Sequence, residues 1–298
     1  MLPRPRPPHR EEDLNPLFFA VMLGLALAQA AHAQRQPDPV AAARAGALNL
    51  KSASALVVEQ GGQRVLYAKN VETVMPIASL TKLMTALVVL ESGLPLAEPV
   101  TISEADVDDV KRTRSRLKVG TTLARGELLK LALMASENRA AAALTRAYPG
   151  GTPAFVAAMN QKAIELGMWR TRFVDGTGLS SDNVSTAQDI ARLVGAAYRH
   201  PLIRDYTTDA THAVALADGR LLHYRNSNRL VKNPHWKIGL SKTGYLSEAG
   251  RCLVLQARIA ATPVIIVLLD SWGKLSRIGD ANRIKKWIES NFSRQPAG

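Results

Sequence analysis

The alternation of apolar and polar positions predicts strands toward both ends of the chain. Residues 53–59 form an apolar run that ends near a Gly-Gly pair, which predicts a strand that turns back through residues 64–68. Three more runs predict strands at residues 236–243, 252–259 and 263–269. The last run, PVIIVLL, is apolar at every position, which is typical of a central strand covered on both faces.

Apolar residues at helical spacing fill the middle of the chain. They predict helices at residues 79–93, 125–135, 139–148, 152–167 and 186–198, with a last helix at 274–291. A glycine-punctuated loop is expected at residues 173–179. Together these elements indicate an α/β fold of the α+β kind, with one sheet from both chain ends and a mostly helical second lobe. The cleft between two lobes is a usual place for a binding site.

The first 33 residues carry the pattern of a signal peptide. An apolar stretch from Leu17 to Ala28 is followed by the small-x-small sequence AHA, which ends at Ala33. The stretch is too short for a comfortable membrane span, although an uncleaved N-terminal anchor is the alternative. We expect cleavage after Ala33 and a mature protein in the periplasm.

Composition divides the rest of the chain and excludes several classes of site. Residues 34–51 predict a tether or a first helix, residues 52–292 a folded domain, and residues 293–298 a tail. Cys252 is the single cysteine, so a disulfide framework and a cysteine-rich zinc module are excluded. The six histidines show no metal-binding spacing, and we expect neither a metal nor a cofactor.

The chain is strongly basic, with 38 Lys and Arg against 25 Asp and Glu and a net charge of +13. Such a charge attracts polyanions. Export makes nucleic acid an unexpected partner and favours peripheral contact with anionic envelope polymers. Five basic residues lie within residues 111–118, KRTRSRLK. This run predicts either a solvated loop or an electrostatic guide for anionic glycan strands.

Three short motifs carry candidate chemistry. In Ser79-Leu80-Thr81-Lys82 the serine and lysine lie three apart, so on a helix Lys82 can reach the Ser79 hydroxyl. A serine becomes a good nucleophile when a neighbouring base removes its proton, and lysine is such a base only when its pKa is lowered. By itself, this spacing is a weak signal that is better explained by a capping serine and a solvated lysine.

The second and third motifs are Ser136-Glu137-Asn138, at a helix break, and Lys242-Thr243-Gly244, at a strand end. A serine and an asparagine two apart can both point into a cleft. A cation, a hydroxyl and a bare backbone along one edge suit an extended peptide that ends in a carboxylate. Alone, the two motifs are also explained by a helix junction and a strand end with a turn glycine.

The order S-x-x-K, S-x-N, K-T-G resembles the constellation of penicilloyl serine transferases. Four stretches resemble the D-alanyl-D-alanine peptidases: PIASLTKLMTALVVLESG, LALMASENRAAAALTRAYPGG, TRFVDGTGLSSDNVSTAQDIARL and LSKTGYLSEAGRCLV. The likeness covers residues 50–290 and looks closest to the type-7 low-molecular-mass penicillin-binding proteins, which are D-alanyl-D-alanine endopeptidases. It implies a β-lactamase/transpeptidase-like fold with an antiparallel sheet.

The resemblance implies a role for each motif residue. Ser79 would be the acylated nucleophile, Lys82 the general base for acylation, and Ser136 the relay of a proton toward the leaving amine. Asn138 would hold Lys82 and bind the substrate amide. The backbone N–H groups of Ser79 and Tyr245 would form the oxyanion hole.

The third motif would bind the far end of the substrate. Lys242 would lie near Ser136 and lower the pKa of Lys82 by like-charge repulsion. Thr243 would bind the substrate carboxylate, with Gly244 beside it in the same strand.

Features that are missing select among relatives. Class A β-lactamases carry a deacylating Glu after the second motif, whereas residues 171–183 here contain none. We interpret Asp175 as a loop-capping residue, and efficient β-lactam hydrolysis is not expected. D-Ala-D-Ala carboxypeptidases carry a C-terminal β-domain and a membrane anchor, and we expect neither here because few residues follow the third motif. This favours cleavage of the D-alanyl–diaminopimelate cross-link.

The implied partners are peptidoglycan peptide cross-links as substrate and β-lactams as covalent inhibitors. Two alternatives stay open: a D-Ala-D-Ala carboxypeptidase of the same family, and a catalytically silent peptidoglycan-binding scaffold. The intact motif residues argue against the scaffold.

Overall fold

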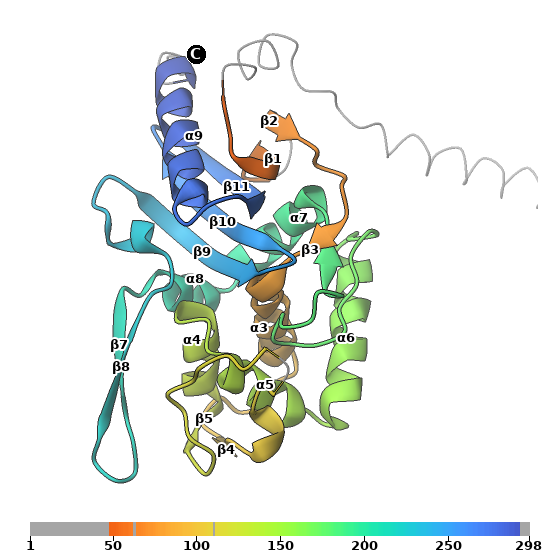
Figure 1. Cartoon of the computed structure of the whole chain (residues 1–298), viewed down its shortest axis with the longest axis vertical. Coiled ribbons are helices and arrows are strands. Elements are labelled where there is room, and N and C mark those ends of the chain that lie inside the picture. The colour runs from red at the N-terminus through yellow and green to blue at the C-terminus, as the bar shows by residue number, and fades with distance from the viewer. Residues whose placement is uncertain (1–47, 62–63, 110, 293–298) are drawn as a thin grey trace, which may run out of the picture. The chain divides into compact units, whose positions relative to one another are not determined.

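The computed structural model describes residues 48–61, 64–109 and 111–292 (Figure 1). The expected signal peptide (residues 1–33), most of the expected tether (34–51) and the tail (293–298) lie outside the described residues. Within the described ranges, no helix has the length and apolar character needed to cross a membrane.

A five-stranded antiparallel sheet forms the upper layer in Figure 1. Its order is β2-β1-β11-β10-β9, and the strands are β1 (Ser52–Glu59), β2 (Val65–Lys69), β9 (Lys237–Leu246), β10 (Gly250–Ile259) and β11 (Thr262–Ser271). All five strands expected from the apolar runs are confirmed. The first and last strands in the sequence are neighbours in the sheet, because β1 pairs with β11, with Val57 opposite Ile266.

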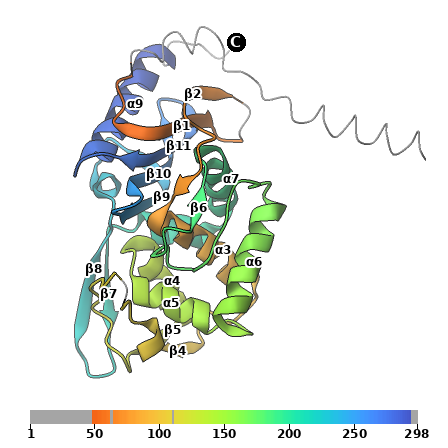
Figure 2. The same cartoon turned by 45° about the vertical axis from the view of Figure 1, so that its right-hand side comes forward.

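The central position of β11 explains its uniformly apolar sequence. Side chains alternate between the two faces of a strand. Val264 and Ile266 pack with helix α9 (Ser276–Phe292) on one face, whereas Ile265 and Val267 belong to the larger core on the other. Figures 1 and 2 show α9 on the outer side of the sheet and α7 (Ala187–Tyr198) on the inner side.

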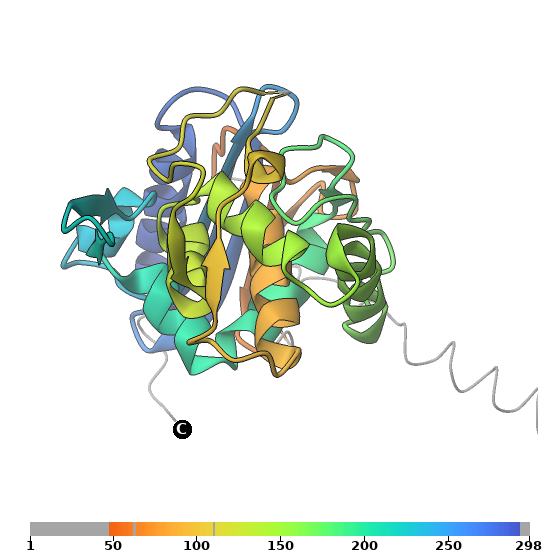
Figure 3. The same cartoon turned by 90° about the horizontal axis from the view of Figure 1, so that it is seen from below.

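Helix α3 (Lys82–Glu91) is the centre of the helical layer. Every residue from Lys82 to Val89 is buried, because other helices surround it, as the view from below shows (Figure 3). The neighbours are α4 (Arg125–Met134), α5 (Asn138–Arg146), α6 (Gly151–Glu165) and α7. These helices confirm the prediction from apolar spacing, to within two residues at most ends.

Several elements were not predicted. They are helix α8 (Pro201–Thr208), the hairpin β7 (Thr211–Ala215) with β8 (Leu221–Arg225), and the short pairs β3 (Met75–Pro76) with β6 (Val184–Ser185) and β4 (Pro99–Thr101) with β5 (Thr122–Ala124). The hairpin buries only Val214 and Tyr224 of its strand residues. Because so few of its positions face the core, its sequence lacks the apolar run that indicates a strand.

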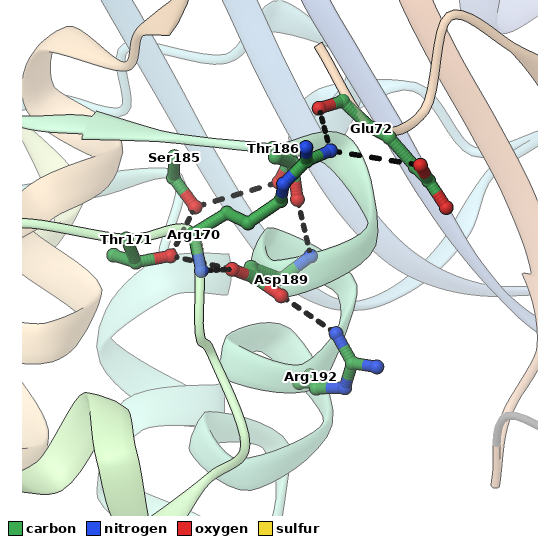
Figure 4. Close-up of polar contacts among 7 residues, drawn as sticks. All are labelled: Glu72, Arg170, Thr171, Ser185, Thr186, Asp189 and Arg192. Carbon is green, nitrogen blue, oxygen red and sulfur yellow. Dashed lines mark hydrogen bonds and ion pairs between the residues drawn. The ribbon is translucent and has the colours of Figure 1, made fainter. Parts of the chain in front are cut away.

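A polar cluster around Asp189 ties three segments together (Figure 4). The buried Asp189 carboxylate, in the first turn of α7, accepts hydrogen bonds from Arg170 N (2.9 Å), Thr171 Oγ1 (2.9 Å) and Arg192 Nη1 (2.6 Å). Arg170 Nη1 in turn donates to the carbonyl oxygen of Glu72 at 2.9 Å. The cluster therefore joins three segments: the start of α7, the residues Arg170 and Thr171, and the backbone at Glu72.

Candidate active site

Ser79 and Lys82 lie at the start of the central helix. Ser79 is in a single 3-10 turn, η1 (Ala78–Thr81), and Lys82 is the first residue of α3. Lys82 Nζ lies 2.9 Å from Ser79 Oγ. Ala78, directly before the serine, has a φ of 48°, in the left-handed region that is strained for a residue with a Cβ. The turn thus presents the hydroxyl to the buried amine.

Lys82 is enclosed by acceptors. Its side chain is fully buried, and Nζ also donates to Asn138 Oδ1 at 2.7 Å and to the carbonyl oxygen of Thr177 at 2.5 Å. Burial lowers the pKa of Lys82 to about 7, although the nearby charges of Asp175 and Glu137 act in the opposite direction. A neutral amine is therefore available near neutral pH, as a general base requires.

A second lysine faces the second motif. Lys242 Nζ on β9 donates to Ser136 Oγ at 2.8 Å. Ser136 has a φ of 60°, at the break between α4 and α5. Burial lowers the pKa of Lys242 well below its usual range, and the positive charges of Lys82 and Arg277 lower it further. Burial is thus the main cause of the lowered pKa for both motif lysines.

Two glycines allow the backbone to close around the nucleophile. A Cβ on Gly244 would lie 3.0 Å from the Ile77 carbonyl oxygen and 3.3 Å from Ser79 N. On the other side, a Cβ on Gly178 would lie 2.1 Å from the Ala78 carbonyl oxygen. The segments that carry the expected oxyanion donors, the N–H groups of Ser79 and of the residue after Gly244, are thus in contact.

Asp175 caps the loop beside Lys82, which confirms the interpretation from sequence. Its carboxylate accepts hydrogen bonds from the backbone N–H groups of Thr177 (2.6 Å), Gly178 (2.6 Å) and Ser180 (2.9 Å). These bonds hold the Thr177 carbonyl toward Lys82.

Two residues beside the third motif were not found from sequence. Thr243 Oγ1 donates to Ser227 Oγ at 2.8 Å. Arg277, from α9, donates to the carbonyl oxygens of Gly244 (2.6 Å) and Cys252 (3.0 Å). Neither residue belongs to a motif. Ser227 lies just before η3 (Arg229–Lys232), which packs against β9, and Arg277 comes from α9, which packs on β10 and β11.

Residues 226–228 form a turn beside the third motif. The asparagines do hold the turn, since Asn226 Oδ1 accepts from Asn228 N at 2.9 Å. The residue between them, Ser227, faces the site. Cys252 is fully buried in β10, as core filler would be.

The basic run at residues 111–118 lies against the site. Lys111 pairs with Glu248 on the turn between β9 and β10, and the Thr113 hydroxyl accepts from Asn138 Nδ2 at 3.0 Å. The Arg116 guanidinium lies over the Tyr224 ring, 5.5 Å from its centroid. Arg112 and Arg114 are exposed. Part of the run is therefore folded against the protein.

Among the described residues, no three His, Cys, Asp or Glu side chains are grouped so as to hold a metal ion.

The chain is similar to several known proteins. A family model described as D-alanyl-D-alanine carboxypeptidase matches residues 40–273. A D-alanyl-D-alanine endopeptidase of Pseudomonas aeruginosa is 46% identical over 277 residues, which are 93% of this chain and 89% of that protein. The endopeptidase of Escherichia coli K12 is 42% identical over 273 residues, 91% and 87% of the two chains.

A solved structure supports the fold. The Streptomyces K15 DD-transpeptidase superimposes with a TM-score of 0.74 and 27% identity, over 80% of this chain and 97% of that one. The expected fold class and the resemblance to type-7 penicillin-binding proteins are both confirmed. The chain therefore belongs to the D-alanyl-D-alanine carboxypeptidase family of serine peptidases.

Proposed function

We propose that this protein is a serine D-alanyl-D-alanine endopeptidase that hydrolyses peptidoglycan cross-links through an acyl-serine intermediate. The observation that carries the proposal is the 2.9 Å contact between Ser79 Oγ and the buried amine of Lys82, whose pKa is about 7. The endopeptidases of two bacteria that match over most of their length support the choice of reaction.

Acylation begins when neutral Lys82 accepts the Ser79 proton. A neutral amine has two N–H groups and one lone pair. Its N–H groups remain on Asn138 Oδ1 and the Thr177 carbonyl, so the lone pair faces Ser79 Oγ. Oγ then attacks the D-alanyl carbonyl carbon. The N–H groups of Ser79 and Tyr245 donate hydrogen bonds to the carbonyl oxygen and stabilise the negative charge that develops on it.

Ser136 then supplies the leaving group with a proton. As the amide C–N bond breaks, the Ser136 hydroxyl gives its proton to the departing amine and regains one from Lys242, whose Nζ lies 2.8 Å away. Before deacylation, Lys82 releases to solvent the proton that it took from Ser79, and Lys242 takes up a proton from solvent. Water then attacks the acyl-enzyme and passes a proton to neutral Lys82, which returns it to Ser79 Oγ as the ester bond breaks.

Thr243 and the nearby cations suit the carboxylate next to the scissile bond. Arg277 donates to the Gly244 carbonyl oxygen next to Thr243. Burial lowers the pKa of Lys242, and a bound substrate carboxylate would favour its protonated form. Asn138 would face the substrate amide. Cross-link cleavage and D-alanine release both free an amine with an adjacent carboxylate, so this subsite serves either reaction. The preference for cross-links rests on the similarity to the two endopeptidases.

Mass spectrometry after incubation with a penicillin tests the mechanism. We expect a stable adduct on the peptide that contains Ser79 and none in Ser79→Ala. Intact penicillin without an adduct on folded wild-type protein would favour the silent scaffold. Consumed penicillin without an adduct would indicate rapid deacylation, as in a β-lactamase. Product analysis on cross-linked muropeptides then separates endopeptidase from carboxypeptidase.

We also propose export to the periplasm with removal of residues 1–33, and peripheral contact with anionic envelope polymers rather than nucleic acid. Arg112 and Arg114 in the loop and Arg225 at the end of β8 are exposed and would attract the carboxylates of stem peptides. Co-sedimentation with purified cell-wall sacculi should weaken with salt and in the double variant Arg112→Gln, Arg114→Gln. The N-terminus of the periplasmic protein checks the cleavage site.

A further inference from the structure

A directional chain of hydrogen bonds leads from the catalytic lysine to a carboxylate outside the three motifs. Lys82 Nζ donates to Asn138 Oδ1 at 2.7 Å, and Asn138 Nδ2 donates to Thr113 Oγ1 at 3.0 Å. Thr113 Oγ1 donates to Asp108 Oδ2 at 2.8 Å. The last two residues lie in the loop after η2 (Glu104–Asp106) and belong to no motif.

Asp108 determines the direction of this chain. An ionised carboxylate only accepts hydrogen bonds, so the Thr113 hydroxyl proton must point at Asp108. The Thr113 backbone N–H also donates to Asp108 Oδ2, at 3.0 Å, which holds the threonine in place. The lone pairs of Thr113 Oγ1 are then left for a donor, and the Nδ2 end of Asn138 supplies it.

The orientation of Asn138 matters because the two ends of an amide are nearly equal in size. Their assignment follows from the partners that surround them. With the amide reversed, its NH2 group would face Lys82 Nζ. This NH2 group would repel the ammonium form of Lys82. In neutral Lys82 it would donate to the nitrogen lone pair, although that lone pair must accept the Ser79 proton.

We infer that Thr113, held by Asp108, is a positioning residue for acylation. It keeps the oxygen of Asn138 toward Lys82 and thereby leaves the lone pair of neutral Lys82 for Ser79. The inference rests on the proposed function of Lys82 as the general base, and it adds a residue from the basic loop to the catalytic arrangement.

Contacts with two separate parts of the protein hold the loop that contains Asp108 and Thr113, and they fix the position of Asp108. The backbone N–H of Lys111 donates to Asp108 Oδ1 at 2.8 Å. The Lys111 ammonium pairs with Glu248, on the turn that follows the third-motif strand. The loop therefore connects the helical layer, at Asn138, with the far end of β9.

The test is the rate of acylation by a labelled penicillin, measured from about pH 5 to about pH 9 on the full mature protein. We expect Thr113→Val to lower the plateau rate about tenfold, the loss typical of one buried hydrogen bond. Its acid limb should move to lower pH, because an Asn138 amide free to turn stabilises neutral Lys82. Thr113→Ser should retain the wild-type profile.

Thr101→Val is the matched control, since the Thr101 hydroxyl hydrogen-bonds with that of Thr122 on an exposed strand pair. Its profile should equal that of the wild type. In an Asn138→Ala background, Thr113→Val should cause no further loss, because Thr113 acts through Asn138. A fold that is merely weakened would lower the melting temperature without moving the acid limb.

Equal profiles for Thr113→Val and Thr113→Ser would overturn the inference, as would an undiminished loss in the Asn138→Ala background. Either result, with a wild-type adduct that is absent from Ser79→Ala, would leave the proposed function intact. No wild-type adduct at all would overturn both.

Discussion

Lys242 Nζ lies 2.8 Å from Ser136 Oγ, although 106 positions separate the two residues in the chain. One residue comes from an edge strand of the sheet and the other from a break between two helices. The contact joins the two lobes at the place where the leaving amine would depart. It also gives Ser136 a source of the proton that this departure consumes.

Acylation should depend on pH through Lys82. Since the pKa of Lys82 is about 7, the amine is protonated below that pH and cannot accept the Ser79 proton. The second-order rate of penicillin acylation should fall about tenfold per pH unit below that pKa and level off above it. Stopped-flow measurement of the rate against pH checks this. A rate independent of pH between about 5 and 8 would exclude Lys82 as the base.

Replacing Lys82 by arginine should abolish acylation at every pH in that range. A guanidinium stays protonated, so it keeps the positive charge but supplies no lone pair. Adduct formation on the intact protein is the measurement. The control is Lys130→Arg. Lys130 lies on α4, pairs with Asp209 at 2.7 Å and is not part of the site. Acylation of this variant should match that of the wild type.

Ser136→Ala should lower turnover of cross-linked muropeptides by about 10²- to 10³-fold, within the range for one proton-transfer group. The Lys242 ammonium would still carry a proton, but at the wrong place to reach the leaving amine. Liquid chromatography of the products gives the rate. Circular dichroism should show an unchanged fold, and turnover close to that of the wild type would remove Ser136 from the proton path.

Gly244→Ala should impair acylation with a moderate loss of stability. The added methyl group would lie 3.0 Å from the Ile77 carbonyl oxygen and 3.1 Å from Ala78 Cβ, so β9 must move away from the nucleophile. Such overpacking typically costs about 1–3 kcal/mol. Gly195→Ala in α7 is the matched control, since its nearest new contact is 3.8 Å from Ile265. It should leave acylation unchanged and raise the melting temperature slightly.

Asp189→Ala should lower the stability of the fold and have little effect on the acylation reaction. The change removes the acceptor of Arg170 N and one of the two partners of Thr171 Oγ1, which also contacts Ser185 Oγ, at a cost of about 1–3 kcal/mol in the free energy of unfolding. Urea unfolding followed by circular dichroism measures the loss. Asp218→Ala removes an exposed aspartate that pairs with Arg220 and should leave the unfolding midpoint unchanged.

Much of this protein follows from patterns that are local in the chain. Strand alternation and helical spacing depend on neighbours a few residues apart, so they located the five sheet strands and most helices. The three-residue step from Ser79 to Lys82 places both on one helix face for the same reason. The polar hairpin β7–β8 was not predicted, because it makes little contact with the core and so lacks an apolar run.

The sequence by itself determined the three motifs, the family resemblance and the alternation that builds the sheet, because each depends on residues close in the chain or on their order. Only the tertiary structure decided the pKa of Lys82, since burial is its main cause. It also decided the partners Thr113, Ser227 and Arg277, which reach the site from separate segments. No pattern in the chain marks such contacts, because they exist only once distant elements have packed.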